Sequence, residues 1–142
     1  MALSETLLLA QDPSRTWWLE LECGALPGNG VYADAIASLA RISRDAWKPT
    51  DVEETWPIEG EPRVSFTMNG ARHEIQLRRR GDWFDVALIS SLNDLFAADE
   101  GRFHALSPRD ETIIILQLTE AERMAFATRG LHPRLISIED AR

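Results

Sequence analysis

The sequence predicts an α+β fold: a single domain over residues 1–142, with a mainly antiparallel sheet of about five strands and about three helices packed on it. The chain has 142 residues, of which 44% are hydrophobic and 27% charged, and this suits one globular domain. Stretches that alternate apolar and polar residues, as strands do, are interspersed with stretches of three- and four-residue apolar spacing, as in helices. An Asn-Gly dipeptide between two alternating stretches favours the tight turn of an antiparallel hairpin.

The first predicted strand covers residues 16–23. Its alternation places Trp17 on the apolar face of the strand, together with Cys23, and Trp18 on the polar face. An apolar run over residues 7–10 could pair with this strand. A glycine-rich loop follows over residues 24–30.

The first predicted helix covers Val31–Trp47, where apolar residues recur at three- and four-residue spacing. Asn29 is the expected N-cap, and Pro49 is expected to end the helix. The next segment, residues 48–61, contains two prolines and a glycine and is rich in acidic residues. It is expected to be an irregular, solvated connection.

A hairpin is predicted over residues 64–77, with Asn69-Gly70 as a type I′ turn. With that turn, three pairs of residues should face each other across the two strands and share one face: Met68 and Ala71, Phe66 and His73, Val64 and Ile75.

A second helix is predicted over residues 83–98, with Asp82 as its N-cap. Residues 102–107 and 112–118 then form a strand pair around a polar turn. Because Ile113–Leu116 is apolar on both faces, we expect the second of these strands to be central in the sheet.

A short third helix is predicted after this strand pair. Thr119 and Glu122 have the spacing of a capping box, and Gly130 follows the last turn of the helix. Residues 135–138 are expected to add an edge strand.

The charge of the chain limits its partners. There are 23 Asp and Glu residues against 15 Lys and Arg, a formal net charge of −8. Nucleic acids and anionic membrane surfaces would repel such a domain, whereas a basic protein would attract it. The apolar runs are too short to cross a bilayer, no secretory signal is recognised, and a lone Cys23 forms no intramolecular disulfide, so we expect a cytoplasmic protein.

No motif for catalysis or for metal or cofactor binding is recognised. Three separated histidines lack ligand spacing, although His73 and His104 could meet a carboxylate in space and hold a metal. The loop before the first helix lacks the lysine of a phosphate-binding loop, and there is no serine elbow. The basic run Arg78–Arg80 could grip a phosphate or an acidic partner, or neutralise nearby acidic groups of the chain itself.

The acidic segment 48–61 is the predicted partner-binding site. It has five acidic residues against one lysine, and it contains Trp56. A large aromatic residue among carboxylates is typical of a protein-binding hot spot that faces a basic surface, although Trp56 could equally fold back onto the core. The predicted partner-binding residues are Asp51, Glu53, Glu54, Trp56, Glu59, Glu61 and, on the exposed face of the first strand, Trp18.

Several segments between residues 31 and 130 form a pattern: Leu39–Ser43, Trp47–Val52, Glu54–Trp56, Asn69-Gly70, Gly81–Asp85, Leu92-Asn93 and Thr119–Arg123. This pattern resembles small bacterial immunity proteins of polymorphic-toxin and contact-dependent growth inhibition systems. The resemblance implies a protein that is not an enzyme and that neutralises a cognate toxin domain by binding it. Nuclease toxins are usually basic, because their substrate is a polyanion, and an acidic inhibitor suits them.

Two other hypotheses remain open at this point. The protein could be a non-catalytic regulatory or assembly module, with a homodimer formed through an exposed strand edge or through Trp18. It could also be an enzyme whose site is assembled from scattered carboxylates and histidines.

Overall fold

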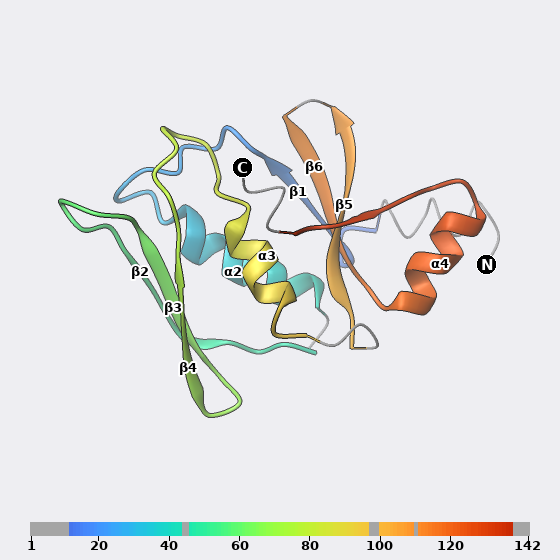
Figure 1. Cartoon of the computed structure of the whole chain (residues 1–142), viewed down its shortest axis with the longest axis horizontal. Coiled ribbons are helices and arrows are strands. Elements are labelled where there is room, and N and C mark those ends of the chain that lie inside the picture. The colour runs from blue at the N-terminus through green and yellow to red at the C-terminus, as the bar shows by residue number, and fades with distance from the viewer. Residues whose placement is uncertain (1–11, 44–45, 97–99, 110, 138–142) are drawn as a thin grey trace.

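The computed structural model describes residues 12–43, 46–96, 100–109 and 111–137. In this part of the chain, three helices and seven strands form an α+β fold, as predicted (Figure 1). The strands make two antiparallel sheets, one of four strands and one of three, so the prediction of a single sheet of about five strands is wrong. The predicted pairing partner at residues 7–10 lies outside the described residues.

The four-stranded sheet has the order β1-β6-β5-β7. Its strands are β1 (Thr16–Glu20), β5 (Arg102–Arg109), β6 (Thr112–Leu118) and β7 (Arg134–Leu135). All seven residues of β6 are buried, which confirms its predicted central place. β1 ends earlier than predicted. Beyond Glu20, the backbone N–H of Leu21 donates to the Glu111 carbonyl in the turn between β5 and β6 at 2.7 Å, and the N–H of Cys23 donates to the Asp82 carbonyl in the loop before α3.

The three-stranded sheet has the order β2-β3-β4 and consists of β2 (Thr50–Thr55), β3 (Arg63–Met68) and β4 (Ala71–Gln76). The hairpin of β3 and β4 has the predicted register, with all three expected residue pairs opposite each other. Asn69 and Gly70 have φ angles of 52° and 78°, as a type I′ turn requires.

The prediction that residues 48–61 are irregular is wrong, because β2 lies within this segment and pairs with β3. β2 leaves the regular register between Thr50 and Glu53, and Asp51 has a φ of 51°. An irregularity of this kind interrupts the pairing locally and bends the strand.

α2 (Val31–Ile42) is shorter than predicted and begins differently. The N-cap is Gly30, with a φ of 68°, and not Asn29, whose side-chain N–H donates to the Gly24 carbonyl at 2.8 Å. Ser43 ends the helix, and its hydroxyl donates to the Ala40 carbonyl at 2.6 Å. Trp47 is buried although it lies beyond the helix.

α3 (Ala87–Asn93) is also shorter than predicted, and Asp82 is not its N-cap. Instead, the Asp82 carbonyl accepts the backbone N–H groups of residues 23–25, and the Asp85 carboxylate accepts the N–H of Ala87 at 3.0 Å. In α4 (Glu120–Thr128) the predicted capping box between Thr119 and Glu122 is present.

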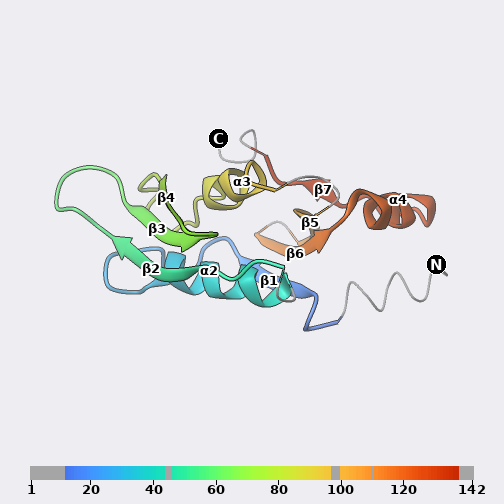
Figure 2. The same cartoon turned by 90° about the horizontal axis from the view of Figure 1, so that it is seen from below.

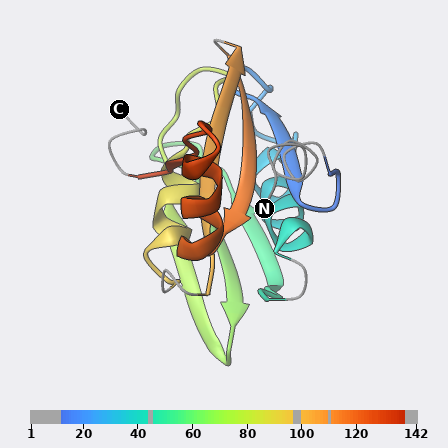
Figure 3. The same ribbon diagram turned by 90° about the vertical axis from the view of Figure 1, so that its right-hand side faces the viewer.

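Two helices join the sheets. α2 contacts β1 and β2, and α3 contacts β4 and β5, so each helix touches one strand of each sheet. Figures 1 and 2 show α2 and α3 between the two sheets along the long axis, and α4 at the far side of the four-stranded sheet. Figure 3 shows this far side, with α4 in front of the strands.

The core has two parts that correspond to the two faces of β6. One cluster takes buried residues from both sheets and from α2 and α3, whereas a smaller one lies under α4 and consists of Ile114, Leu116, Leu118 and Phe126. No helix in the described residues has both the length and the apolar character that a membrane crossing requires.

Candidate partner-binding surface

The predicted acidic site lies on β2 and on the loop that follows it. Asp51 and Glu53 are exposed, whereas Glu54 and Trp56 are partly covered. Consecutive residues of a strand point to opposite faces, so the acidic residues of β2 do not form one continuous patch.

Glu54 points towards α2. One of its carboxylate oxygens accepts the backbone N–H of Ala33 at 2.7 Å, and the other accepts the indole N–H of Trp56 at 2.6 Å. Ala33 lies in the first turn of α2, where N–H groups have no partner within the helix. Glu54 therefore supplies the cap that Gly30 lacks, and its charge is used inside the protein.

Glu53 lies on the outer face of the three-stranded sheet, close to Arg72. The guanidinium of Arg72 is 3.7 Å from the Glu53 carboxylate and donates to the Asp51 carbonyl at 2.6 Å and the Ser65 hydroxyl at 2.9 Å. This face therefore carries both charges.

Trp56 folds back onto the core, which was one of its two predicted placements. Its ring stacks on Tyr32, with centroids 6.1 Å apart and an interplanar angle of 26°. The Arg79 guanidinium covers the indole, 5.2 Å from the ring centroid. Only part of the indole remains available to a partner.

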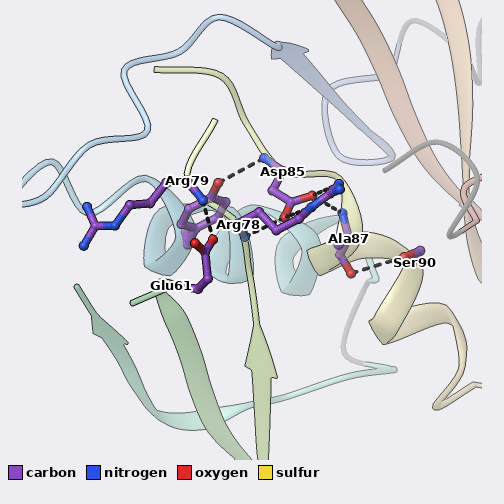
Figure 4. A network of polar contacts seen from close by, with 7 residues as sticks. Glu61, Arg78, Arg79, Asp85, Ala87 and Ser90 are labelled. Carbon is purple, nitrogen blue, oxygen red and sulfur yellow. Dashed lines mark hydrogen bonds and ion pairs between the residues drawn. The ribbon is translucent and has the colours of Figure 1, made fainter. Parts of the chain in front are cut away.

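Residues 57–62, here called the 57–62 loop, connect β2 to β3 and are held by Arg79. The Arg79 side chain donates to the carbonyls of Pro57 and Gly60, the second at 2.9 Å. Its backbone N–H donates to the Glu61 carboxylate at 2.7 Å (Figure 4). The two residues between these anchors, Ile58 and Glu59, are exposed, and Ile58 is fully so.

The neighbouring Arg78 pairs with Asp85, whose carboxylate is completely buried. Asp85 accepts the Arg78 backbone N–H at 2.8 Å and lies 3.5 Å from the Arg78 guanidinium (Figure 4). Arg78 and Arg79 thus bond to acidic or carbonyl groups of their own chain, which agrees with the second of the two interpretations of the basic run.

Trp18 is not brought together with the acidic residues. It is 50% exposed and lies on β1 opposite Ile114, on the face of the four-stranded sheet that carries α4. The three-stranded sheet lies on the other side, beyond α2 and α3.

The histidines do not meet in a metal site. His73 stacks on Phe66, with centroids 5.5 Å apart, and the buried His104 has its Nδ1 at 2.9 Å from the Arg102 carbonyl. Burial lowers the pKa of His104 below its ordinary value. Within the described ranges, no group of three or more His, Cys, Asp or Glu side chains is placed to hold a metal ion.

Cys23 also lacks the surroundings of a nucleophile. Burial, and then the negative charge of Asp82, raise the pKa of its thiol, which disfavours the reactive thiolate.

A hollow of about 460 Å³ lies beside Trp47, between the turn of the hairpin and the end of α3, and Lys48 and Glu100 are its charged lining residues.

The prediction from sequence missed two features of this surface, the exposed Ile58 and the anchor Arg79. An apolar residue between Pro57 and Glu59 was the available signal for the first. No local pattern indicates that Arg79 bonds a loop about twenty residues earlier in the chain.

No protein-family model, curated protein or solved structure matches this chain.

Proposed function

We propose that this protein is a toxin-neutralising immunity protein of the cytoplasm, which binds a cognate basic, nuclease-like toxin domain and thereby inhibits it. In this proposal the protein is not an enzyme and uses no cofactor. The observation that carries the proposal is the 57–62 loop, which presents a fully exposed Ile58 beside the exposed Glu59 on an internally bonded frame.

An exposed isoleucine costs the free protein solvation free energy, and burial in an apolar pocket of a partner would recover it. Because Arg79 already holds the loop, little conformational entropy is lost on binding. Glu59, Glu53 and Asp51 add negative charge along β2 and the loop, and the net charge of −8 would steer a basic partner towards the protein.

This arrangement changes the expected roles of the predicted residues. Ile58, Glu59, Glu53 and Asp51 contact the toxin domain, and the uncovered edge of Trp56 extends the surface. Glu54 and Glu61 hold the surface in shape through their bonds to Ala33 and Arg79.

The first experiment is a pull-down with the tagged protein from a lysate of its source cells at low salt, with the captured material identified by mass spectrometry. The captured domain is then expressed in bacteria with and without this protein. We expect one basic domain in stoichiometric amount that stops growth alone and is harmless when the two are co-expressed. A captured domain that is harmless alone, or toxic in both cases, would contradict the proposal, as would the absence of a captured protein.

With the toxin domain in hand, Ile58→Asp and Glu59→Lys test the surface. Both side chains are exposed, so the fold should tolerate the changes, and we expect each to weaken binding by about tenfold or more. Glu111→Lys is the matched control, because it makes the same charge change at an exposed residue of the β5–β6 turn. Equal affinity of all three variants and the unaltered protein would remove the 57–62 loop from the interface.

A further inference from the structure

β4 has an unpaired edge that is longer and more regular than the other strand edges in the described part of the chain. It has six residues, β3 is its only strand partner among the described residues, and its register has no irregularity. Figures 1 and 3 show the β3–β4 hairpin extending past α2 and α3, with β4 on the side away from β2.

The other edges are blocked or short. The free side of β2 has an irregular register and the positive φ of Asp51. At the start of β1, the Arg41 guanidinium donates to the Thr16 carbonyl at 3.2 Å. β7 has two residues.

The register of the hairpin determines which backbone groups of β4 face outward. In a two-residue hairpin, the residues next to the turn bond each other, and bonded and non-bonded pairs then alternate. Ala71, His73 and Ile75 therefore bond β3, and the N–H of Leu77 continues this series with a bond to the Pro62 carbonyl at 2.8 Å. The N–H and carbonyl groups of Arg72 and Glu74 consequently point to the free edge.

The residues along this edge are complementary to themselves. If a second copy pairs antiparallel with the strands centred on His73, Arg72 of each copy lies opposite Glu74 of the other, and Ala71 lies opposite Ile75. A shift of the centre by one residue in either direction would place Arg72 opposite Arg72, or Glu74 opposite Glu74, which is unfavourable. Backbone bonding permits all three of these registers, and charge favours the one centred on His73.

The two charged side chains are accessible for such pairs. Both are exposed and lie on the outer face of the sheet. Within one copy, the Arg72 guanidinium donates to Ser65, Thr67 and the Asp51 carbonyl and lies 3.7 Å from Glu53, so in the dimer it exchanges part of these contacts for the Glu74 carboxylate of the second copy. The Glu74 carboxylate lies 4.0 Å from the Arg63 guanidinium, a loose contact that leaves it able to bond a closer partner.

We propose that the protein forms a symmetric homodimer in which two β4 strands pair antiparallel around His73, so that two three-stranded sheets become one six-stranded sheet. The cross-strand ion pairs between Arg72 and Glu74 determine the register. This interface does not depend on the proposed function and leaves the 57–62 loop of each copy accessible.

Charge reversal tests the proposal, with the mass in solution measured by sedimentation over a wide range of protein concentration. Glu74→Arg and Arg72→Glu each place like charges opposite each other, so we expect each variant to be a monomer where the unaltered protein is a dimer. An equimolar mixture of the two variants restores opposite charges at every pair, and we expect it to dimerise. Dimerisation of the mixture also shows that both variants are folded.

Three outcomes would overturn the proposal: an unaltered protein that stays monomeric at every concentration, single variants that dimerise as strongly as the unaltered protein, or a mixture that stays monomeric. Glu59→Lys is the matched control, because it makes the same charge change as Glu74→Arg on the 57–62 loop and should leave the dimer unchanged. A toxin domain that no longer binds Glu59→Lys while that variant still dimerises would separate this interface from the toxin-binding surface.

A disulfide tests the register directly, in a Cys23→Ser background. His73 would lie opposite His73 of the second copy in a non-bonded pair, at a separation of about 4.5 Å between Cα atoms, which a disulfide can span. We expect oxidised His73→Cys to form a covalent dimer, and Glu74→Cys, offset by two residues from its counterpart, to remain monomeric. Equal crosslinking of both variants would contradict the register.

Discussion

Tyr32 illustrates how single side chains connect distant parts of this fold. Its hydroxyl accepts the backbone N–H of Asp85 at 3.0 Å, and its ring lies between Trp56 and Phe84, with centroid distances of 6.1 and 5.1 Å. Tyr32 is buried, and this burial raises the pKa of its hydroxyl to about 12. Tyr32 of α2 thus bonds Asp85, which precedes α3, and packs against Trp56, which follows β2.

Titration of Tyr32 can be followed directly, because it is the only tyrosine in the sequence. We expect phenolate absorbance near 295 nm to appear with a midpoint near pH 12 in the folded protein, and near pH 10 in denaturant. Since the folded state holds the proton more tightly, its stabilising effect is complete below about pH 10 and is lost as the pH rises from 10 to 12.

Tyr32→Phe should abolish this absorbance change, which makes it the control for the assignment. A folded protein with a midpoint near pH 10 would show that the hydroxyl is exposed to solvent, and would contradict the packing of Trp56 over Tyr32.

At the scale of the element, α2 depends on a residue from another strand. Gly30 has no side chain to cap the helix, and Glu54 of β2 takes this role through the N–H of Ala33. Glu61 similarly bonds the backbone of Arg79, and Asp85 bonds the backbone of Arg78 and Ala87. Acidic side chains thus hold several segment ends of this protein in place.

We expect Glu54→Ala to lower the free energy of unfolding by about 1–2 kcal/mol, because it leaves a first-turn N–H and the Trp56 indole N–H without their partner. Urea denaturation measures the change. Glu53→Ala is the matched neighbour on the exposed face, and its effect should stay within about 0.5 kcal/mol. A loss for Glu54→Ala that also stays within about 0.5 kcal/mol would show that the bonds of Glu54 contribute little to stability.

For the whole molecule, the important feature is that one core cluster serves both sheets. It contains Val64 and Phe66 of the three-stranded sheet, Phe103 and Ile115 of the four-stranded sheet, and the buried faces of α2 and α3. Neither sheet can bury its apolar face without these helices, so the two sheets should unfold together.

We therefore expect a single unfolding transition, with the same urea midpoint for tryptophan fluorescence and far-UV circular dichroism. Leu77→Ala removes a fully buried side chain next to the three-stranded sheet and should lower the free energy of unfolding by about 2–5 kcal/mol for both probes. Two separate transitions, or a loss seen by one probe alone, would show that the sheets are independent units.

The sequence by itself determined the features that rest on short-range chemistry. Asn69-Gly70 set the register of the hairpin, because few other residues adopt positive φ at both turn positions. Thr119 and Glu122 set the start of α4 through a local capping box. The apolar run of β6 indicated a strand covered on both faces, and the two core clusters cover it.

Tertiary structure alone decided the arrangement of the candidate surface. Acidic composition and prolines predicted an irregular segment at residues 48–61, yet the edge of β3 offered pairing partners and made β2 a strand. Which acidic side chains are free depends on contacts with α2, Arg72 and Arg79, all distant in sequence. The ends of α2 and α3 also differ from prediction, because Ser43 and Asp85 bond the backbone there in ways that apolar spacing does not encode.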